Sequence, residues 1–421
     1  MIIRYWLSLL LLIILFPLSV AGKVLIPMDL NQTNHLKAYG IAWWVLRHDI
    51  TVEWLLNYRG GSFLIDEFPA LARECRLRNV SFQQAGSSEV LAIYDQIEQE
   101  NMDRIRLEMA PKIAVYMPPG TQPWDDAVSM ALNYAEIEYT TVWDHEVLAG
   151  ELVEYDWLHL HHEDFTGQYG KFYASYRSAP WYIQQQQEFE QVAHQLGYSK
   201  VSREKLAVAL EIRNYVADGG FLFAMCSATD SYDIALAAAG TDICDAVFDG
   251  DPSAPDCQQK LDYSQTLAFT GFQLYTSPLI YEYSNIDTTP PRGGPPRAME
   301  SDYFKLFEFS AKWDPVPTML TQNHVSVIKG FMGQTTGYHR ENLKSNLIIM
   351  GETPGRDEVK YLHGNFGKGM FSFYGGHDPE DYQHRVGDPP TDLNLHPRSP
   401  GFRLILNNVL FPAARKQKQK T

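Results

Sequence analysis

Short apolar runs alternate with stretches of helical spacing along most of the chain. Residues 23–28 are apolar, residues 35–47 have helical spacing and residues 51–57 are apolar again, which predicts a strand, a helix and a strand in one βαβ unit. The charged segment 89–108 is expected to be helical. We therefore expect an N-terminal βαβ unit over residues 22–110 that packs on a larger domain.

The alternation continues beyond residue 110. Helices are predicted at residues 202–218 and at residues 124–135, whose apolar face includes Trp124. Strands are predicted at four short apolar runs, residues 112–116, 139–143, 156–160 and 221–225. Such alternation predicts an α/β fold with a doubly wound, mostly parallel sheet, in which reactive groups lie at the carboxyl ends of the strands.

After about residue 240 the regular alternation gives way to loops. Residues 290–296 are too rich in proline for a helix or a central strand and are expected on the surface. Residues 359–362 and 370–374 are predicted to form a hairpin, because glycines join them and no helix follows as in a dinucleotide site. The predicted parts are a main domain over residues 111–412, an insertion at about 240–320 and a basic tail over 413–421.

The first residues have the composition of a cleavable secretory signal. Arg4 gives a positive start, residues 6–16 are almost purely apolar, and Ser19-Val20-Ala21 is a small-x-small cleavage site. We expect residues 1–21 to be removed and the protein to be exported, either to the periplasm or out of the cell. An uncleaved membrane anchor is the alternative, although the apolar run is shorter than the ~20 residues of a spanning helix.

Composition limits the classes of partner. The formal net charge of -16 argues against nucleic acid or an anionic membrane surface, because both require a basic face. We expect a small molecule, a sugar or a peptide as ligand, and no membrane contact after signal cleavage. Aromatic residues between Tyr169 and Tyr182 could stack on a sugar or peptide, or could simply pack in the core.

Four cysteines are too few to build a disulfide scaffold. Cys244 and Cys257 are close enough in sequence to form a disulfide in an oxidising compartment, and free thiols are the alternative. The aspartates between Asp242 and Asp256 lack the alternating spacing of a calcium loop, so a solvated acidic loop is favoured there.

Cys226 has the sequence setting of a catalytic nucleophile. A buried strand, residues 221–225, leads through Cys226 into a predicted helix, as in a nucleophile elbow. The sharp turn requires small residues two positions before and after the nucleophile, and these are Ala224 and Ala228. Backbone N–H groups at the helix start would activate the thiol, and Ser227 would line the substrate site. The alternative is a buried, inert cysteine.

A base for this thiol is predicted after the strand at residues 370–374. His377 would accept the thiol proton, and Glu380 or Asp378 would hold the imidazole tautomer. Asp378 is also expected to line the substrate site. The alternative is a surface turn with acidic caps.

A second polar cluster ends the strand predicted at residues 156–160. His161, His162, Glu163 and Asp164 follow one another at its carboxyl end, so we expect them to shape a substrate site in the same cleft as Cys226.

The same cluster contains candidate metal ligands. His159, His161 and Glu163 could bind zinc or another divalent metal, with His377 or Asp378 as a distant ligand. A polar network without metal is favoured, so no cofactor is required.

The elbow cysteine and the late histidine resemble the class I glutamine amidotransferase-like superfamily, whose flavodoxin-like domain has an elbow Cys in GxCxG and a late HxE. The likeness covers roughly residues 112–410, with residues 23–58 resembling an added βαβ unit. Leu25-Ile-Pro-Met-Asp and Asn34-His-Leu-Lys-Ala-Tyr-Gly are similar to exported proteins commonly labelled asparagine synthetase B. The chain lacks the N-terminal Cys and the ATP-pyrophosphatase motif of the true enzyme of that name.

Two departures from the amidotransferase pattern argue against glutaminase activity. Alanines replace the glycines around Cys226, and two residues instead of one separate His377 from Glu380. The leading hypothesis is an exported cleft hydrolase of amide or ester bonds that uses Cys226, His377 and Glu380. The alternatives are a metal-dependent hydrolase built on residues 159–164 and a non-catalytic ligand-binding protein.

Overall fold

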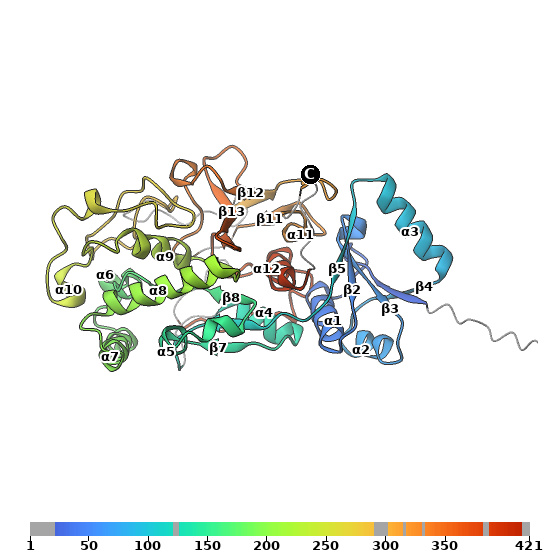
Figure 1. Ribbon diagram of the computed structural model, residues 1–421, viewed down its shortest axis with the longest axis horizontal. Coiled ribbons are helices and arrows are strands. Elements are labelled where there is room, and N and C mark those ends of the chain that lie inside the picture. Colours follow the sequence, from blue (N-terminus) through green and yellow to red (C-terminus); the bar gives the residue numbers. More distant parts are fainter. Residues whose placement is uncertain are drawn as a thin grey trace, which may run out of the picture.

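The computed structural model describes residues 22–120, 126–289, 302–314, 317–330, 333–381 and 387–414. The predicted signal, Trp124, the proline-rich run 290–296 and the basic tail from residue 415 lie outside these ranges. Among the described residues, no helix has the length and apolar character needed to cross a bilayer. The described residues form two β-sheets with helices packed on them, and the N-terminal sheet lies at the right of Figure 1.

The N-terminal sheet is antiparallel throughout. Its strands are β1 (Lys23–Ile26), β2 (Val52–Leu56), β3 (Ser62–Asp66), β4 (Gln83–Ala85) and β5 (Asp103–Leu107), in the order β4-β1-β3-β2-β5. Helices α1 (His35–Arg47) and α2 (Leu71–Leu77) pack on one face and α3 (Ser87–Gln99) on the other. This arrangement corrects two sequence predictions.

The predicted βαβ unit is split, because β3 lies between the parallel strands β1 and β2. The chain reverses after β2 through Asn57 and Arg59, both at positive φ, and Gly60 and Gly61 continue the left-handed turn. The segment 89–108 is not one helix either, since α3 ends at Gln99 and β5 follows.

The larger sheet is mixed rather than mostly parallel. Its order is β11-β10-β12-β13-β14-β9-β8-β6-β7. The parallel half consists of β14 (Gly369–Tyr374), β9 (Phe221–Met225), β8 (Trp157–Leu160), β6 (Ile113–Tyr116) and β7 (Thr140–Val142). The antiparallel half consists of β13 (Val359–Phe366), β12 (Ile348–Glu352), β10 (Tyr303–Leu306) and β11 (Val327–Lys329). β13 and β14 form the predicted hairpin.

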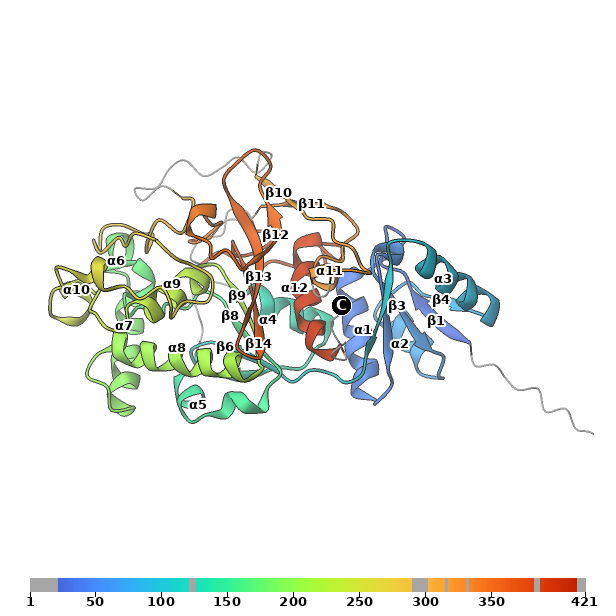
Figure 2. The same cartoon turned by 45° about the horizontal axis from the view of Figure 1, so that its top comes forward.

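Helices cover both faces of the parallel half, as predicted. One face packs α4 (Ala127–Ala135) and α12 (Pro400–Leu410), and the other packs α8 (Val201–Asp218) and α9 (Ser227–Ala237). Figure 2 shows these helices around the central strands. The remaining helices are α5 (Asp144–Leu148), α6 (Tyr173–Tyr176), α7 (Pro180–Gln195), α10 (Ala246–Asp249) and α11 (Pro317–Leu320). Short 3-10 turns span Tyr58–Gly60, Glu151–Glu154, Tyr169–Lys171, Cys257–Lys260, Arg340–Asn342 and Phe411–Ala413.

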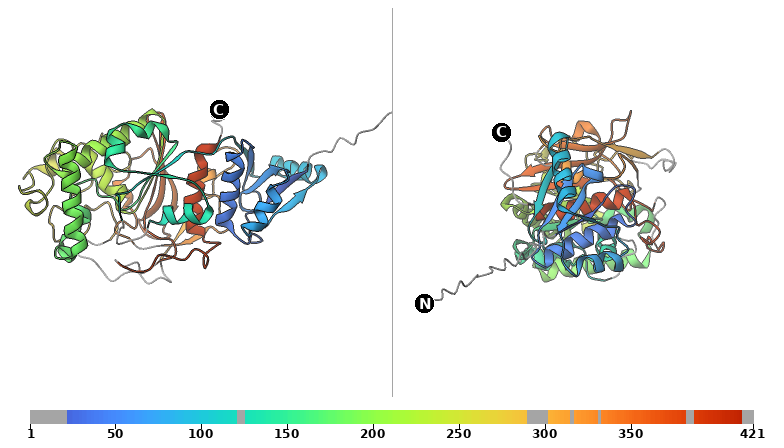
Figure 3. Two further views of the ribbon diagram at one scale, coloured as in Figure 1. Left: turned by 90° about the horizontal axis from the view of Figure 1, so that it is seen from below. Right: turned by 90° about the vertical axis from the view of Figure 1, so that its right-hand side faces the viewer.

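The two sheets are joined through α1, α4 and α12, which pack against one another (Figure 3). Gly40 on α1 is required there, because a Cβ atom would lie 1.8 Å from the carbonyl oxygen of Ala135 on α4. Arg403 on α12 is fully buried and donates hydrogen bonds to the Tyr39 hydroxyl and to the carbonyl oxygens of Met28 and Gly60. These contacts fix the N-terminal unit on the larger domain.

Candidate metal centre

Three parallel strands deliver the candidate residues to one edge of the sheet. His161 follows β8, Cys226 follows β9, and His377 lies three residues after β14. Because neighbouring parallel strands end at the same edge, segments far apart in sequence meet there. The sequence therefore predicted correctly that these three residues share one region.

His161, His162 and His377 form a compact group of imidazoles. One ring nitrogen from each lies within 4.8 Å of the others. The ring centroids are 3.8 Å apart for His161 and His162, 3.8 Å for His162 and His377, and 4.6 Å for His161 and His377. His161 Nε2 and His377 Nδ1 share a hydrogen bond of 2.9 Å. His161 and His377 are buried and His162 is half-buried, so the group is reached from one side.

Asp126 completes the group on the side away from His377. It caps α4 by accepting a 2.6 Å hydrogen bond from the Ser129 N–H, and its other oxygen lies 3.2 Å from His161 Nδ1 and 3.3 Å from His159 Nε2. Burial alone would raise the pKa of Asp126, but the two imidazoles hold it well below its usual value. Asp126 is therefore a half-buried, ionised carboxylate beside the imidazole group.

Sequence reasoning missed Asp126, although a signal was present. An acidic residue at the start of a helix that follows a central strand lies at the same edge as the strand ends. His159, a predicted metal ligand, is fully buried; its Nδ1 lies 3.1 Å from the Phe223 carbonyl oxygen and its Nε2 faces Asp126. His159, Asp126 and His161 form a second group whose donor atoms also lie within 4.8 Å of one another, and His161 belongs to both groups.

Cys226 has the strained backbone of an elbow, with φ 52° and ψ -138°. Its thiol is 1% exposed, and Sγ accepts a 3.3 Å hydrogen bond from the Gln334 N–H. Burial raises the pKa of Cys226 to about 11, although backbone N–H groups of Thr335, Gln334 and Ser227 oppose that rise. The predicted elbow is present, but its thiol is buried and protonated at neutral pH.

The predicted nucleophile, base and orienter, Cys226, His377 and Glu380, have the following neighbours in the structure. Gly333 lies against both Cys226 and His377, and a Cβ there would be 2.9 Å from Sγ and 3.2 Å from His377 Cβ. Within the described residues His377 Nδ1 is bonded to His161, whereas the Glu380 carboxylate lies 3.3 Å from His396 Nδ1. The ring of His377 thus contacts His161, and the described contact of the Glu380 carboxylate is with His396.

Two of the predicted substrate-site carboxylates organise loops. Asp164 accepts hydrogen bonds from the Thr166 and Gly170 N–H groups at 2.7 and 2.9 Å, and Asp378 accepts one from the Glu380 N–H at 2.8 Å.

The other two predicted substrate-site residues differ from these in role and exposure. Ser227 is buried as the first residue of α9. Glu163 is half-buried, and burial raises its pKa to about 8 against the opposing charge of Lys205. Of these residues, Glu163 is the one that stays partly accessible beside the imidazole group.

The acidic segment after residue 240 is held by a lysine. Lys200 Nζ lies 2.9 Å from Asp242 and 3.0 Å from Asp249 and also contacts Asp251, so an ammonium group already serves as the cation there. Cys244 and Cys257 are free thiols, and the possible disulfide between them is therefore not formed.

Comparison with known proteins gives a likeness of structure without a likeness of sequence. No family model and no curated protein matches the chain. The cytoplasmic protein STM3548 from Salmonella typhimurium is similar with a TM-score of 0.34 and 10% identity, over 72% of this chain and 100% of that chain. The cytoplasmic protein STM1381 from Salmonella typhimurium LT2 has a TM-score of 0.36 and 11% identity, over 72% and 100%.

A β-galactosidase from Bacillus circulans sp. alkalophilus has a TM-score of 0.27 and 11% identity, over 79% of this chain and 36% of that chain. Similarities at this level establish no family, so the function is argued from the site.

Proposed function

We propose that this protein is a divalent-metal-dependent hydrolase whose metal is bound by His161, His162 and His377. The observation that carries the proposal is the convergence of one ring nitrogen from each of these residues within 4.8 Å. Two of the ligands come from the end of β8 and the third from the segment after β14, so the fold itself brings them together.

The donor set favours zinc among the common metals. Three imidazoles with one open coordination position are the ligands of a catalytic zinc, which lowers the pKa of a bound water and supplies a hydroxide nucleophile. Carboxylate partners of ligating histidines fix the ring orientation and strengthen binding. Asp126, 3.2 Å from His161 Nδ1, has that position here. Amide or ester bonds are the proposed substrates, with the water oxygen added to the acyl carbon and a proton to the leaving group.

Zinc titration of the purified, chelator-treated protein tests the proposal. We expect one equivalent of Zn²⁺ to bind by calorimetry, and His377→Ala to weaken binding by about 100-fold or more, since a ligand is lost. His396→Ala is the matched control, because this histidine lies near the same segment but pairs with Glu380. Equal zinc affinity in the two variants would refute the metal centre.

The second candidate is a cysteine hydrolase, favoured by the positive φ of Cys226 at the β9–α9 turn and by the resemblance to amidotransferase-like proteins. Hydrolysis of 4-nitrophenyl acetate separates the candidates. Inhibition by a chelator with restoration by Zn²⁺, and retention of activity in Cys226→Ala, supports the metal centre. Inactivation by iodoacetamide and by Cys226→Ala, without chelator sensitivity, supports the cysteine. Zinc binding without any turnover would favour a ligand-binding role.

We also propose that the protein is exported, on the strength of residues 1–21. Expression with a C-terminal reporter in a bacterium would test this: the mature protein is expected outside the cytoplasm with its N-terminus at Gly22 or Lys23. Retention of residues 1–21 on a cytoplasmic product would contradict it.

A further inference from the structure

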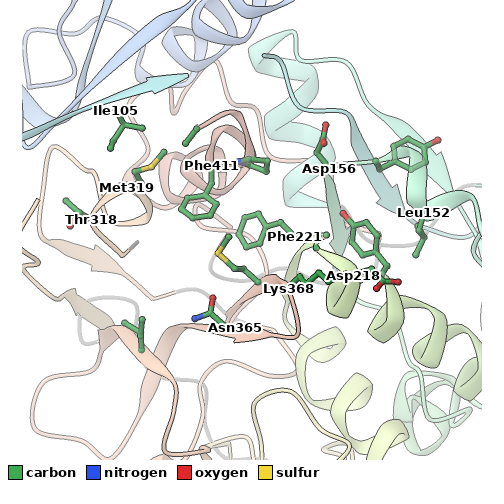
Figure 4. A pocket seen from close by; sticks show the side chains of 18 of the residues that line it. Ile105, Leu152, Asp156, Asp218, Phe221, Thr318, Met319, Asn365, Lys368 and Phe411 are labelled. Carbon is green, nitrogen blue, oxygen red and sulfur yellow. The ribbon is translucent and has the colours of Figure 1, made fainter. Parts of the chain in front are cut away.

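A cavity of about 860 Å³ lies where the N-terminal unit meets the larger domain (Figure 4). Ile105 of β5 lines it from the N-terminal sheet, and Phe221 of β9, Met319 of α11 and Phe411 line it from the larger domain. Cavities of this size at a domain junction are frequent sites for small ligands.

This cavity is separate from the imidazole group. Asp156 immediately precedes β8, Phe221 begins β9, and Met370 is the second residue of β14, and all three line the cavity. Parallel strands begin at one edge of a sheet and end at the other. The cavity therefore lies at the opposite edge from His161 and His377, and the proposed hydrolase does not use it.

The inner wall of the cavity is aromatic and apolar. The rings of Phe221 and Phe411 lie with centroids 5.2 Å apart, and both side chains are nearly buried. Met319 and Met370 extend this surface, and Tyr215 covers Gly220 beside it. A flat or alkyl group could lie against this wall and remove apolar area from water.

The rim of the cavity is acidic. Lys312 and Lys368 also line it, so carboxylates outnumber lysines by five to two. Lys312 Nζ donates to the carbonyl oxygen of Glu98 at 2.5 Å, and Asp156 Oδ2 accepts a 2.8 Å hydrogen bond from the Lys112 N–H. Asp218 is exposed at the last position of α8, and Figure 4 shows it and Asp156 on the same side of the cavity. The lining carboxylates are Asp103, Asp156, Glu211, Asp218 and Asp314.

We propose that this cavity binds an organic cation with an apolar body. The ammonium or guanidinium group would lie at the rim near Asp218 and Asp156, and the apolar body would lie on Phe221 and Phe411, whose ring faces also attract cations. Acidic rims repel carboxylates and phosphates, so anionic amphiphiles do not fit. Because both units contribute walls, the bound cation stabilises their docking.

A pair of probes with one body and opposite charge tests the proposal. 4-Phenylbutylamine is expected to bind, and 4-phenylbutyrate to bind about tenfold or more weakly, at low ionic strength. Asp218→Asn should weaken amine binding about threefold, as for one exposed charge. Asp95→Asn, the same change on the exposed face of α3, should leave it unchanged.

Methyl-labelled methionine locates the amine in NMR spectra. The signals of Met319 and Met370 are expected to shift on titration, and those of Met225 and Met350, buried in β9 and β12, to stay. Three results would overturn the proposal. The two probes could bind equally, or the Met319 and Met370 signals could stay in place on titration. The third is a shift of these signals with protein concentration in the absence of amine, as expected if a second copy of the chain entered the cavity. Zinc titration of the same protein in parallel tests the proposed metal centre independently of the cavity.

Discussion

Among the residues that the structure describes, two groups of stacked histidines lie in very different electrostatic surroundings. At the junction of the two units, His35 and His324 stack with ring centroids 4.2 Å apart and an interplanar angle of 11°. At the sheet edge, His161 and His162 stack at 3.8 Å and 14°. The ring geometry is nearly the same, so geometry alone does not distinguish a structural group from a metal centre.

The neighbouring charge makes the difference. Arg403 Nη1 lies 3.3 Å from His324 Nδ1, and burial together with this guanidinium lowers the pKa of His35 to about 3 and that of His324 to about 4. His35 Nε2 also donates to the carbonyl oxygens of Met28 and Asp29. A cation is repelled there, whereas Asp126 attracts one to His161. A buried histidine group beside a carboxylate is thus the better candidate for a metal.

The largest expected effect is on stability, from Arg403→Met. The buried guanidinium of Arg403 donates to the Tyr39 hydroxyl and to the carbonyl oxygens of Met28 and Gly60, so its loss leaves three buried or partly buried acceptors unsatisfied and should cost about 3–5 kcal/mol. Urea unfolding measures this loss in the free energy of unfolding. Arg398 is an exposed arginine nearby, and Arg398→Met is the control. Zinc affinity is expected to stay unchanged; a parallel loss would mean that the two histidine groups are coupled.

Asp126→Asn should weaken zinc binding by about 10- to 100-fold, because the carboxylate that orients His161 becomes neutral. Asparagine still caps a helix, so the melting temperature should change little. Asp245→Asn makes the same change at the N-cap of α10 and should leave zinc affinity unaltered. Equal zinc affinities of the wild type and Asp126→Asn would show that the nearby carboxylate does not distinguish the histidine group at the sheet edge from the one at the junction.

Acid should destabilise the junction. The folded-state pKa values of His35 and His324 lie below that of an unfolded histidine, about 6.5, so the unfolded chain binds more protons between about pH 6.5 and 4. Their stabilising contribution is complete above pH 6.5 and falls as pH is lowered, by about 1 kcal/mol for His35 at pH 5.5 and less for the partly exposed His324.

Urea midpoints at pH 7 and pH 5.5 measure this loss. His324→Phe keeps a stacked ring without a titratable group and should reduce the pH dependence. His48 is an exposed ring beside Trp44, and His48→Phe should leave the pH dependence of the urea midpoint as in the wild type. A wild-type pH dependence in His324→Phe would show that His324 contributes nothing to the acid response, and the prediction for this residue would be wrong.

Glu380→Gln should have the smallest effect. Its carboxylate pairs with the partly exposed His396, and such pairs contribute about 0.5 kcal/mol or less. Zinc affinity and any esterase activity should change less than about twofold. A large loss of activity would instead restore Glu380 to the role of orienter for His377.

The sequence was most informative where local pattern decides structure. Apolar runs located β6, β8 and β9, the glycine-joined pair located the β13–β14 hairpin, and the carboxyl-end rule brought His161, Cys226 and His377 to one edge. It was least informative about pairing at long range. Nothing in Ser62–Asp66 shows that it inserts between β1 and β2, because register and neighbours depend on the whole sheet.

The site shows the same limit. Cys226 has the local sequence of an elbow, and the structure has the positive φ that this requires. Gln334 covers Cys226, and His377 is oriented toward His161. In each pair the two residues are more than 100 positions apart in the sequence, so no local spacing predicts the contact. Asp126 was hidden for the same reason, since its partners lie on another strand.

The position of α12 between the two units also has a kinetic consequence. Tyr39 and Asn407 share a hydrogen bond although they are 368 positions apart, and Arg403 reaches Met28 across 375 positions. Closing loops of this length costs chain entropy before the contacts that stabilise the closed loop have formed. We expect the docking of the N-terminal unit to be a late and slow step of folding, during which the apolar face of α1 is uncovered and the chain is most prone to aggregate.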